Sequence, residues 1–398
     1  MDNAATSFPK PPAVLEAMAR YANDLGASAG RGAYHEAVET GHLIAECRRQ
    51  LNHLFHGEKP EHFIFTLNCT DALNLAIKGL ILSTHHAPRT AHHAICTAID
   101  HNSVLRPLNA LADAGWVVRT VIPVDPVTGL VDPDDIRRAI RPDTRVICVT
   151  HASNVTGTVQ DIRAIGAIAR RHDIPFIVDA AQSVGHLPID LQADNIDLLA
   201  APGHKGLLGP LGTGILYVRP GFDEILCPIK EGGTGSVSEN DRQPRFLPDR
   251  YEPGSHNAIG IIGLLEGVRW IAQQTIQKLA THDRKLIATF LDGLADIPGL
   301  RLHGPPGVRH RTSVFSVTID GFEPYELAAA LENGFGILTR PGLHCAPLIH
   351  QTLGTLNKGG TTRFSFGPFL TAPDVAFAAD ALAQIAFSAT KQLQNTKA

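Results

Sequence analysis

The sequence predicts an α/β protein with a mostly parallel sheet in a large domain and a smaller α+β domain at its C-terminal end. One observation is that short apolar runs alternate with segments of helical periodicity from about residue 91 onward. Another is the length of 398 residues with 44% hydrophobic residues. Because single hydrophobic cores stop growing at roughly 250 to 300 residues, we expect two domains with separate cores.

The first part of the chain is expected to contribute an arm, two helices and a βα unit. Residues 1–15 form the arm, and amphipathic helices follow over 14–26 and 37–54. Residues 61–80 have the pattern of a strand, a turn and a helix. Six further apolar runs predict the rest of the sheet, with helices on both of its faces. These runs are 94–100, 116–125, 144–153, 175–182, 196–205 and 213–218.

A stretch rich in proline, glycine and charged residues interrupts this pattern at 231–257. It is too long for an ordinary connection, so we expect either a functional loop or a subunit contact. We place the large domain at 16–257 and the small domain at 258–398. The small domain begins with one long predicted helix over 259–294, followed by a strand–helix–strand pattern, another strand and a last helix.

The composition excludes several classes of function. The 35 Lys and Arg residues against 39 Asp and Glu residues offer no basic field for nucleic acid or anionic lipid. No apolar run is long enough for a membrane span, and the first residues lack the apolar stretch of a signal peptide. The six cysteines are scattered without paired spacing, as in proteins whose thiols stay reduced. We therefore expect a cytoplasmic protein that binds neither nucleic acid nor membrane.

The 20 histidines do not predict a metal site. His85, His86, His92 and His93 lie close together in the sequence, but the HExxH motif and the Cys/His spacings of zinc sites are absent. We therefore interpret this run as solvated loop histidines and expect no bound metal.

Three polar residues follow three apolar runs of the predicted sheet. Asn154, Asp179 and Lys205 are separated by intervals that each hold one crossover, so right-handed connections bring them to the same sheet edge. A desolvated acid there needs a facing cation, and a desolvated lysine loses its proton easily. Both suit pyridoxal phosphate, whose aldehyde needs a lysine and whose pyridine nitrogen needs a carboxylate. A buried ion pair between Asp179 and Lys205 is the alternative.

Seven motifs also occur in a characteristic order along the chain. They are DNAATSFPKP, the DHNS around His101, THASNVTGT, VDAAQS, GHKGLLGPLGTG, EPGSHN and RPGLHCAP. In this order they resemble cysteine desulfurases and selenocysteine lyases of the class V aminotransferase fold, over nearly the whole chain. The resemblance implies the fold type I of pyridoxal-phosphate enzymes, with an arm, a large cofactor domain and a small domain, in a homodimer.

The resemblance assigns roles around the cofactor ring. It implies that Lys205 is the Schiff-base lysine, that His101 stacks on the ring and that Asp179 pairs with the pyridine nitrogen. It also implies that Gln182 and Asn154 contact the oxygen side of the ring.

The resemblance also assigns phosphate ligands. Thr70, in a turn that opens a helix, is similar to the family's phosphate-binding threonine, and a helix N-terminus attracts anions. His204 is similar to another phosphate ligand, and Ser255 to a hydroxyl residue that reaches the phosphate in the partner subunit. Pro202 departs from the pattern, because many relatives have a serine or threonine there.

Cys345 decides which reaction is expected. It lies in a loop that begins at Arg340 and precedes a predicted helix with Pro347 near its first position. A thiol at a helix N-terminus, beside His344 and near an arginine, is favoured as the thiolate nucleophile. The alternative is a small buried hydrophobic residue. The segment RPGLHCAP also resembles the short catalytic loop of the second group of cysteine desulfurases.

Arg363 is similar to the arginine that binds the substrate carboxylate in this fold. Its planar guanidinium can donate two hydrogen bonds to a carboxylate, and we expect Asn154 and Arg340 beside it at the substrate site. A surface arginine on an edge strand is the alternative. The GPF that follows Arg363 departs from the polar pair of the well-studied group, so the match is closer to a less characterised branch.

The favoured hypothesis is a pyridoxal-phosphate-dependent cysteine desulfurase, a sulfurtransferase acting on L-cysteine or a related amino acid. Lys205 would take the Cα proton, His101 would shuttle protons and Cys345 would receive the sulfur as a persulfide. Alanine would be the product, and the sulfur would pass to a small thiol or a sulfur-acceptor protein. Selenocysteine lyase, another cysteine-derivative lyase, a class V aminotransferase and a non-catalytic cofactor-binding protein are the alternatives.

Overall fold

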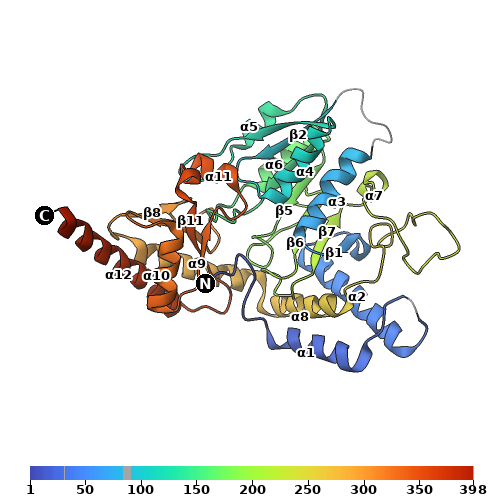
Figure 1. Cartoon of the computed structure of the whole chain (residues 1–398). Helices are drawn as coiled ribbons and strands as arrows, with labels where there is room; N and C mark the ends of the chain where they lie inside the picture. The colour runs from blue at the N-terminus through green and yellow to red at the C-terminus, as the bar shows by residue number, and fades with distance from the viewer. Residues whose placement is uncertain (31, 84–90, 398) are drawn as a thin grey trace.

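The computed structural model describes residues 1–30, 32–83 and 91–397, and its larger part is organised around a seven-stranded sheet (Figure 1). The antiparallel exception in this sheet is β7, which pairs with β1 and β6 in that orientation. The mostly parallel sheet is therefore confirmed. In spatial order the strands are β1 (Phe63–Thr66), β7 (Gly214–Val218), β6 (Leu198–Pro202), β5 (Phe176–Asp179), β4 (Thr144–Thr150), β2 (His92–Thr97) and β3 (Val117–Ile122).

Helices cover both faces of this sheet, because successive residues of each strand point to opposite sides. In β5, Phe176 and Val178 face one core, and Ile177 faces the other. The first core includes α2 (His35–Leu54), α5 (Pro133–Ala139), α6 (Ile162–Arg171) and α8 (Ala258–Gln274). The second includes α3 (Cys69–Leu82) and α4 (Asn102–Asp113).

A four-stranded antiparallel sheet forms the centre of the C-terminal part. Its order is β10 (Arg340–Gly342), β11 (Thr361–Ser365), β9 (Val314–Ile319) and β8 (Leu300–His303). Three helices share its core, namely α9 (Ile276–Leu294), α10 (Pro324–Phe335) and α12 (Ala372–Lys397). Phe290 is central to this core, since its ring lies 4.7 Å from that of Phe315 and 5.1 Å from that of Phe366.

The prediction of one long helix over 259–294 is wrong. The chain forms α8 and α9 instead, and the break falls at Thr275, which has a left-handed φ of 64°. The break has a packing reason, because α8 packs against α1 (Pro12–Arg20) and α2, whereas α9 packs against α12. Most buried residues of α9 thus belong to a different core from those of α8, although Leu279 near its start still lies in the core of α8. The proposed domain boundary at 257/258 remains a prediction.

The strand–helix–strand pattern of the small domain is present with shifted bounds. The second strand begins at Arg340 instead of Gly336, and the edge strand β8 was not predicted. The remaining short helices are α7 (Phe222–Ile225), α11 (Pro347–Thr352), a π-helical turn (Tyr21–Leu25) and the 3-10 turns Pro60–His62 and Leu356–Lys358.

The interpretation of the histidine run is also wrong for one residue. His93 is fully buried in β2, where its ring nitrogens lie 2.8 Å from the hydroxyls of Thr144 and Thr120. The apolar alternation of a strand does not reveal such a residue, because two hydroxyl partners satisfy the ring inside the core. His85 and His86 lie outside the described residues.

Two further features of the described chain concern metals and membranes. Among the described residues, no group of three or more His, Cys, Asp or Glu side chains is placed to hold a metal ion. No described helix is both long enough and apolar enough to cross a membrane.

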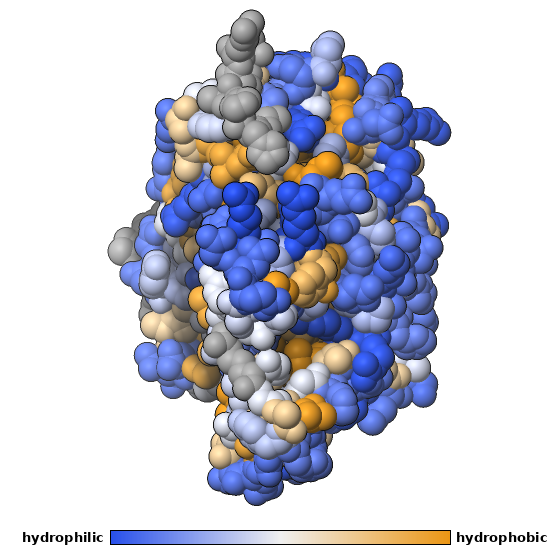
Figure 2. All heavy atoms as spheres, turned by 90° about the vertical axis from the view of Figure 1, so that its right-hand side faces the viewer, coloured by the Kyte–Doolittle hydropathy of each residue, from blue (hydrophilic) through white to orange (hydrophobic). Residues whose placement is uncertain are grey.

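Figure 2 shows one face of the molecule, where hydrophilic residues cover most of the surface and smaller apolar areas lie between them.

Candidate active site

A pocket lies where the carboxyl ends of β4, β5 and β6 meet the N-terminal ends of α3 and α4. The last residue of each of these strands, namely Thr150, Asp179 and Pro202, lines it. This is where ligands bind in open α/β sheets, because loops from several βα units converge there. Seven predicted site residues also line the pocket, namely Thr70, His101, Asn154, Asp179, Gln182, His204 and Lys205.

Asp179 and Lys205 provide an acid and a base in the pocket. Burial raises the pKa of Asp179, while the N–H of Ala181 and the charge of Lys205 lower it. Burial also lowers the pKa of Lys205, which makes its neutral amine easier to form. Both side chains line the pocket, and the described structure contains no direct ion pair between them. Each charge shifts the pKa of the other group towards its ionised form, so a buried charge pair stays open as the alternative.

Cys69 also lines the pocket, although the sequence did not predict it as a site residue. Its Sγ donates a hydrogen bond to Asp179 Oδ1 at 3.6 Å. Burial raises the pKa of Cys69 well above its usual value, so the residue stays a thiol and keeps this hydrogen. Cys69 reaches the pocket because it is the first residue of α3 and precedes Thr70.

His101 is a neutral residue at the start of α4. Its Nδ1 accepts a hydrogen bond from the backbone N–H of Ser103 at 3.0 Å, which assigns the ring proton to Nε2. Burial and the nearby charge of Lys205 lower the pKa of His101 to about 4. The Ser103 hydroxyl also lies 2.7 Å from that of Thr70, so it links the two helix starts. Ser103 was missed, although its spacing two residues after His101 is that of a helix-capping contact.

The arm reaches the cofactor side of the pocket. Ser7 Oγ donates to the carbonyl oxygen of Lys205 at 2.9 Å, and Lys10 Nζ donates to that of His204 at 2.7 Å. Burial, with help from Lys205 and Lys10, lowers the pKa of His204 to about 4. A neutral His204 can still donate a hydrogen bond to an anion.

Ser255 does not lie in this pocket. It lines a separate cavity with its neighbours in the 231–257 segment. Leu67 and Lys230, which lie outside this segment, line the same cavity. The expected contact of Ser255 with the phosphate in a partner subunit requires a dimer, so it stays a prediction.

Cys345 lies on the short connection between β10 and α11, and it is exposed. This finding removes the alternative of a buried hydrophobic thiol. Cys47, Cys69, Cys96 and Cys148 are buried, whereas Cys227 is half-buried.

Two hydrogen bonds fix the backbone around Cys345. The N–H of Asn102, at the start of α4, donates to the Cys345 carbonyl oxygen at 2.8 Å. Asn154 Nδ2 donates to the His344 carbonyl oxygen at 2.6 Å. His344 and Cys345 both have left-handed φ angles, 50° and 59°, which cost non-glycine residues about 1 kcal/mol each. The loop therefore holds a strained conformation close to the pocket.

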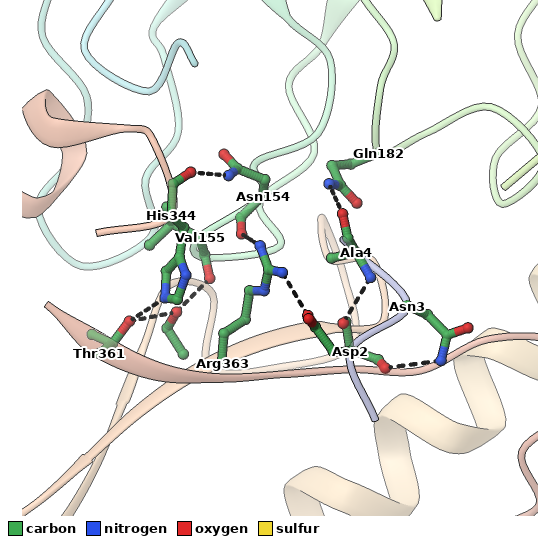
Figure 3. A network of polar contacts seen from close by, with 11 residues as sticks. Asp2, Asn3, Ala4, Asn154, Val155, Gln182, His344, Thr361 and Arg363 are labelled. Atoms are coloured by element: carbon green, nitrogen blue, oxygen red, sulfur yellow. Dashed lines mark hydrogen bonds and ion pairs between the residues drawn. The ribbon is translucent and has the colours of Figure 1, made fainter. Parts of the chain in front are cut away.

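His344 does not supply the positive charge expected beside the thiol. Its ring is buried and contacts the hydroxyl of Thr361 at 3.3 Å (Figure 3). Burial and the nearby charge of Arg363 lower the pKa of His344 to about 2, so the ring is neutral. The cations near the loop are instead Arg340 and Arg363, which lie opposite each other in β10 and β11.

Arg363 is fully buried on a central strand, so the alternative of a surface arginine on an edge strand is wrong. Its Nη1 donates to the Asn154 carbonyl oxygen at 3.1 Å, and its Nη2 donates to Asp2 Oδ1 at 2.7 Å (Figure 3). Burial lowers the pKa of Arg363, and Asp2 opposes this shift. Asp2 was not among the predicted site residues. The DNAAT motif was the available signal.

Unpaired polar atoms indicate what the pocket can hold. His204 Nδ1 and Asn154 Oδ1 are buried without a hydrogen-bond partner in the described chain. Because leaving such an atom unpaired costs about 1 to 3 kcal/mol, a polar ligand is expected to satisfy them. With Lys205 for an aldehyde and Asp179 for a ring nitrogen, this set fits pyridoxal phosphate.

Comparisons with known proteins identify the family. The family described as Aminotransferase class-V matches residues 1–377, and the chain belongs to this family. A probable cysteine desulfurase from Methanothermobacter thermautotrophicus is 33% identical over 386 residues, which cover 96% of this chain and 94% of the relative. Another, from Pyrococcus abyssi, is 31% identical over 92% of this chain and 88% of the relative.

Solved structures agree with the sequence relatives. The apo structure of a cysteine desulfurase from Thermococcus onnurineus NA1 has a TM-score of 0.88 and 29% identity, covering 97% of this chain and 94% of that one. The cysteine desulfurase CsdA from Escherichia coli, in its S-sulfonic acid form, has a TM-score of 0.86 and 27% identity, covering 98% and 94%. The predicted family, fold class and cysteine desulfurase activity are therefore confirmed.

Proposed function

We propose that this protein uses pyridoxal phosphate to convert L-cysteine to L-alanine and leaves the sulfur as a persulfide on Cys345. The observation that carries this proposal is the exposed Cys345 on a short connection, fixed by hydrogen bonds from Asn102 and Asn154. Asn154 lines the same pocket as Asp179 and Lys205. Cys345 itself does not line that pocket, but Asn154 connects the two by its hydrogen bond to the residue before Cys345, and this connection supports a role of the thiol as nucleophile.

Residues of the large sheet hold the cofactor in this proposal. Lys205 would hold the aldehyde carbon, Asp179 would pair with the pyridine nitrogen, and Gln182 and Asn154 would contact the oxygen side of the ring. When bound, pyridoxal phosphate supplies an electron sink for the electron pair released at Cα. The phosphate ligands are Thr70, at the start of the 14-residue helix α3, and His204.

The other residues bind and deprotonate the substrate. Arg363 binds the substrate carboxylate, with Asn154 and Arg340 beside it. The lowered pKa of Lys205 suits its neutral amine to take the proton from Cα. The ammonium that Lys205 becomes on taking this proton is the proton source for the product carbon, and neutral His101, with its proton on Nε2, would act as a shuttle that gives up this proton only as it receives another.

Cys345 then performs the sulfur transfer. Its thiolate attacks the sulfur of L-cysteine, a sulfur–sulfur bond forms, and the carbon–sulfur bond breaks. The released carbon takes protons and becomes alanine, so no external oxidant or reductant is needed. The persulfide passes its outer sulfur to a small thiol or a sulfur-acceptor protein.

We also propose a homodimer and a cytoplasmic location. The dimer rests on the long polar segment 231–257 and on Ser255, which lines a cavity beside Leu67, an apolar side chain that is 63% exposed. Light scattering at assay concentration measures the assembly, and an active monomer contradicts it. The location rests on the free cysteines, which suit a reducing compartment.

The test of the activity is an assay of all products from one reaction. The holoprotein is incubated with L-cysteine and a reductant, with and without added 2-oxoglutarate, and alanine, sulfide, pyruvate and glutamate are quantified together. We expect equal amounts of alanine and sulfide. Pyruvate in place of alanine indicates a lyase of another kind, and formation of glutamate from an added keto acid indicates an aminotransferase.

A further inference from the structure

The N-terminal arm places a carboxylate on the arginine proposed to bind the substrate carboxylate (Figure 3). Asp2 Oδ1 lies 2.7 Å from Arg363 Nη2, and the side chains are 31% and 1% exposed respectively. Arg363 Nη1 is occupied by the Asn154 carbonyl oxygen, whereas the buried Nε has no partner in the described chain. One guanidinium donor, Nε, therefore lacks a hydrogen-bond acceptor, and another, Nη2, is bound by the carboxylate of Asp2.

Other contacts hold the arm in place independently of this ion pair. The N–H of Ser365 donates to the Met1 carbonyl oxygen at 2.9 Å, and the N–H of Ala4 donates to Ser365 Oγ at 2.8 Å. Gln182 Nε2 donates to the Ala4 carbonyl oxygen at 3.0 Å. Asp2 is thus presented to Arg363 on a segment that is already anchored on both sides. A group tethered in this way has a high effective concentration at its partner.

A second carboxylate at the same guanidinium meets an electrostatic obstacle. If Asp2 stays in place, two anions share one arginine, and like charges at close range repel in a buried site. If Asp2 leaves Nη2, the incoming carboxylate exchanges one charged hydrogen bond for another and gains little. Arg340, opposite Arg363 in the sheet, adds positive charge but does not remove the competition.

We propose that Asp2 is an internal competitor for Arg363, so that a substrate carboxylate binds only as Asp2 is displaced. This inference rests on the proposed role of Arg363. Its consequence is a uniform weakening of carboxylate binding, which affects L-cysteine and the product alanine alike. Uniform weakening raises KM without changing the chemical step, and it helps alanine to leave.

The experiment measures binding of three small probes to the holoprotein without turnover. L-alanine carries a carboxylate and an amine, propionate lacks the amine, and ethylamine lacks the carboxylate. Their dissociation constants are measured by ligand-detected NMR titration for the wild type, Asp2→Asn and Glu16→Gln. Glu16 is an exposed carboxylate on α1, so the control makes the same charge change away from the site.

The expected result is a matched gain for the two carboxylates. Asp2→Asn should bind propionate and L-alanine tighter by the same factor, about tenfold, because both lose the same competitor. Ethylamine affinity and the Glu16→Gln variant should stay at wild-type values. Unchanged or weaker carboxylate binding in Asp2→Asn overturns the inference, because Asp2 would then only orient Arg363.

A double-mutant cycle separates this inference from the proposed function. In an Arg363→Ala background, Asp2→Asn should have no further effect on propionate binding, because the two residues act through one contact. Arg363→Lys replaces Arg363→Ala if the latter loses the visible absorption of its cofactor. If the Arg363 variants bind propionate and L-alanine as tightly as the wild type, the carboxylate-binding role of Arg363 fails, whatever Asp2 does.

Discussion

The cofactor side and the substrate side of the active site are built in different ways. On the cofactor side, Asp179 ends β5, and Lys205 follows the neighbouring strand β6 closely. On the substrate side, Asn154 meets His344 across 190 positions of sequence, and Arg363 meets Asp2 across 361. The lining of the first side comes from the large sheet and the helices that follow its strands, and the arm adds only contacts to the backbone of His204 and Lys205. The second side exists only when the small sheet and the arm pack against the large sheet.

This difference predicts how variants on the two sides behave. Changes on the cofactor side should remove the cofactor together with the activity, because the same residues hold both. Changes on the substrate side should leave the cofactor bound and alter only what happens to the amino acid. The following experiments test this division, in order of decreasing expected effect.

Lys205→Ala should have the largest effect. We expect activity to fall by several orders of magnitude and covalent attachment of the cofactor to be lost, because the attaching amine and the Cα base are the same group. Visible absorption after gel filtration and peptide mapping after borohydride reduction measure the attachment. Reduction that labels a different lysine in the wild type contradicts the assignment.

Cys345→Ala should separate the two sides most clearly. The variant should keep the visible absorption of its cofactor, because the groups around Lys205 are unchanged. Alanine formation from L-cysteine should fall by several orders of magnitude, on the scale of losing a covalent nucleophile. Cys227→Ala, at a half-buried cysteine, is the matched control and should remain active. Near wild-type release of alanine and sulfide by Cys345→Ala would refute the proposed mechanism.

Arg363→Lys should change substrate binding by a smaller amount. Lysine keeps the positive charge but loses the planar pair of donors, so KM for L-cysteine should rise about 10- to 100-fold. The visible absorption should stay at the wild-type value. Loss of the cofactor at unchanged KM would place Arg363 on the cofactor side and break the division described above.

The smallest effect concerns the fold that supports both sides. Burial lowers the pKa of His151, next to the end of β4, to about 4, against about 6.5 in an unfolded chain. Between these values the unfolded state binds the proton and the folded state does not, so the free energy of unfolding falls as the pH falls.

His151→Gln should make the free energy of unfolding less dependent on pH between 4 and 7, because up to one fewer proton is taken up on unfolding. Urea unfolding at several pH values between 4 and 7 measures the slope, and His42→Gln, at a histidine on the surface of α2, is the control. If the slope of His151→Gln equals that of the wild type, the buried ring does not contribute in this pH range.

The large sheet and the residues at its edge follow from the amino-acid sequence alone. Apolar periodicity is a local property, and a residue directly after a buried strand must lie at the end of that strand. The sequence pattern is therefore sufficient to group Asn154, Asp179 and Lys205 at one edge. Cys345 is also recognisable in this way, because its surroundings lack the apolar pattern that flanks the buried cysteines.

Which distant groups meet depends on the tertiary structure. The break at Thr275 follows from the packing of α8 and α9 on different cores, and local propensity does not announce it. The burial of His93, the neutral ring of His344 and the pairing of Asp2 with Arg363 likewise depend on partners from other elements. The physical reason is that burial and charge pairing depend on three-dimensional neighbours, whereas periodicity reports only on neighbours along the chain.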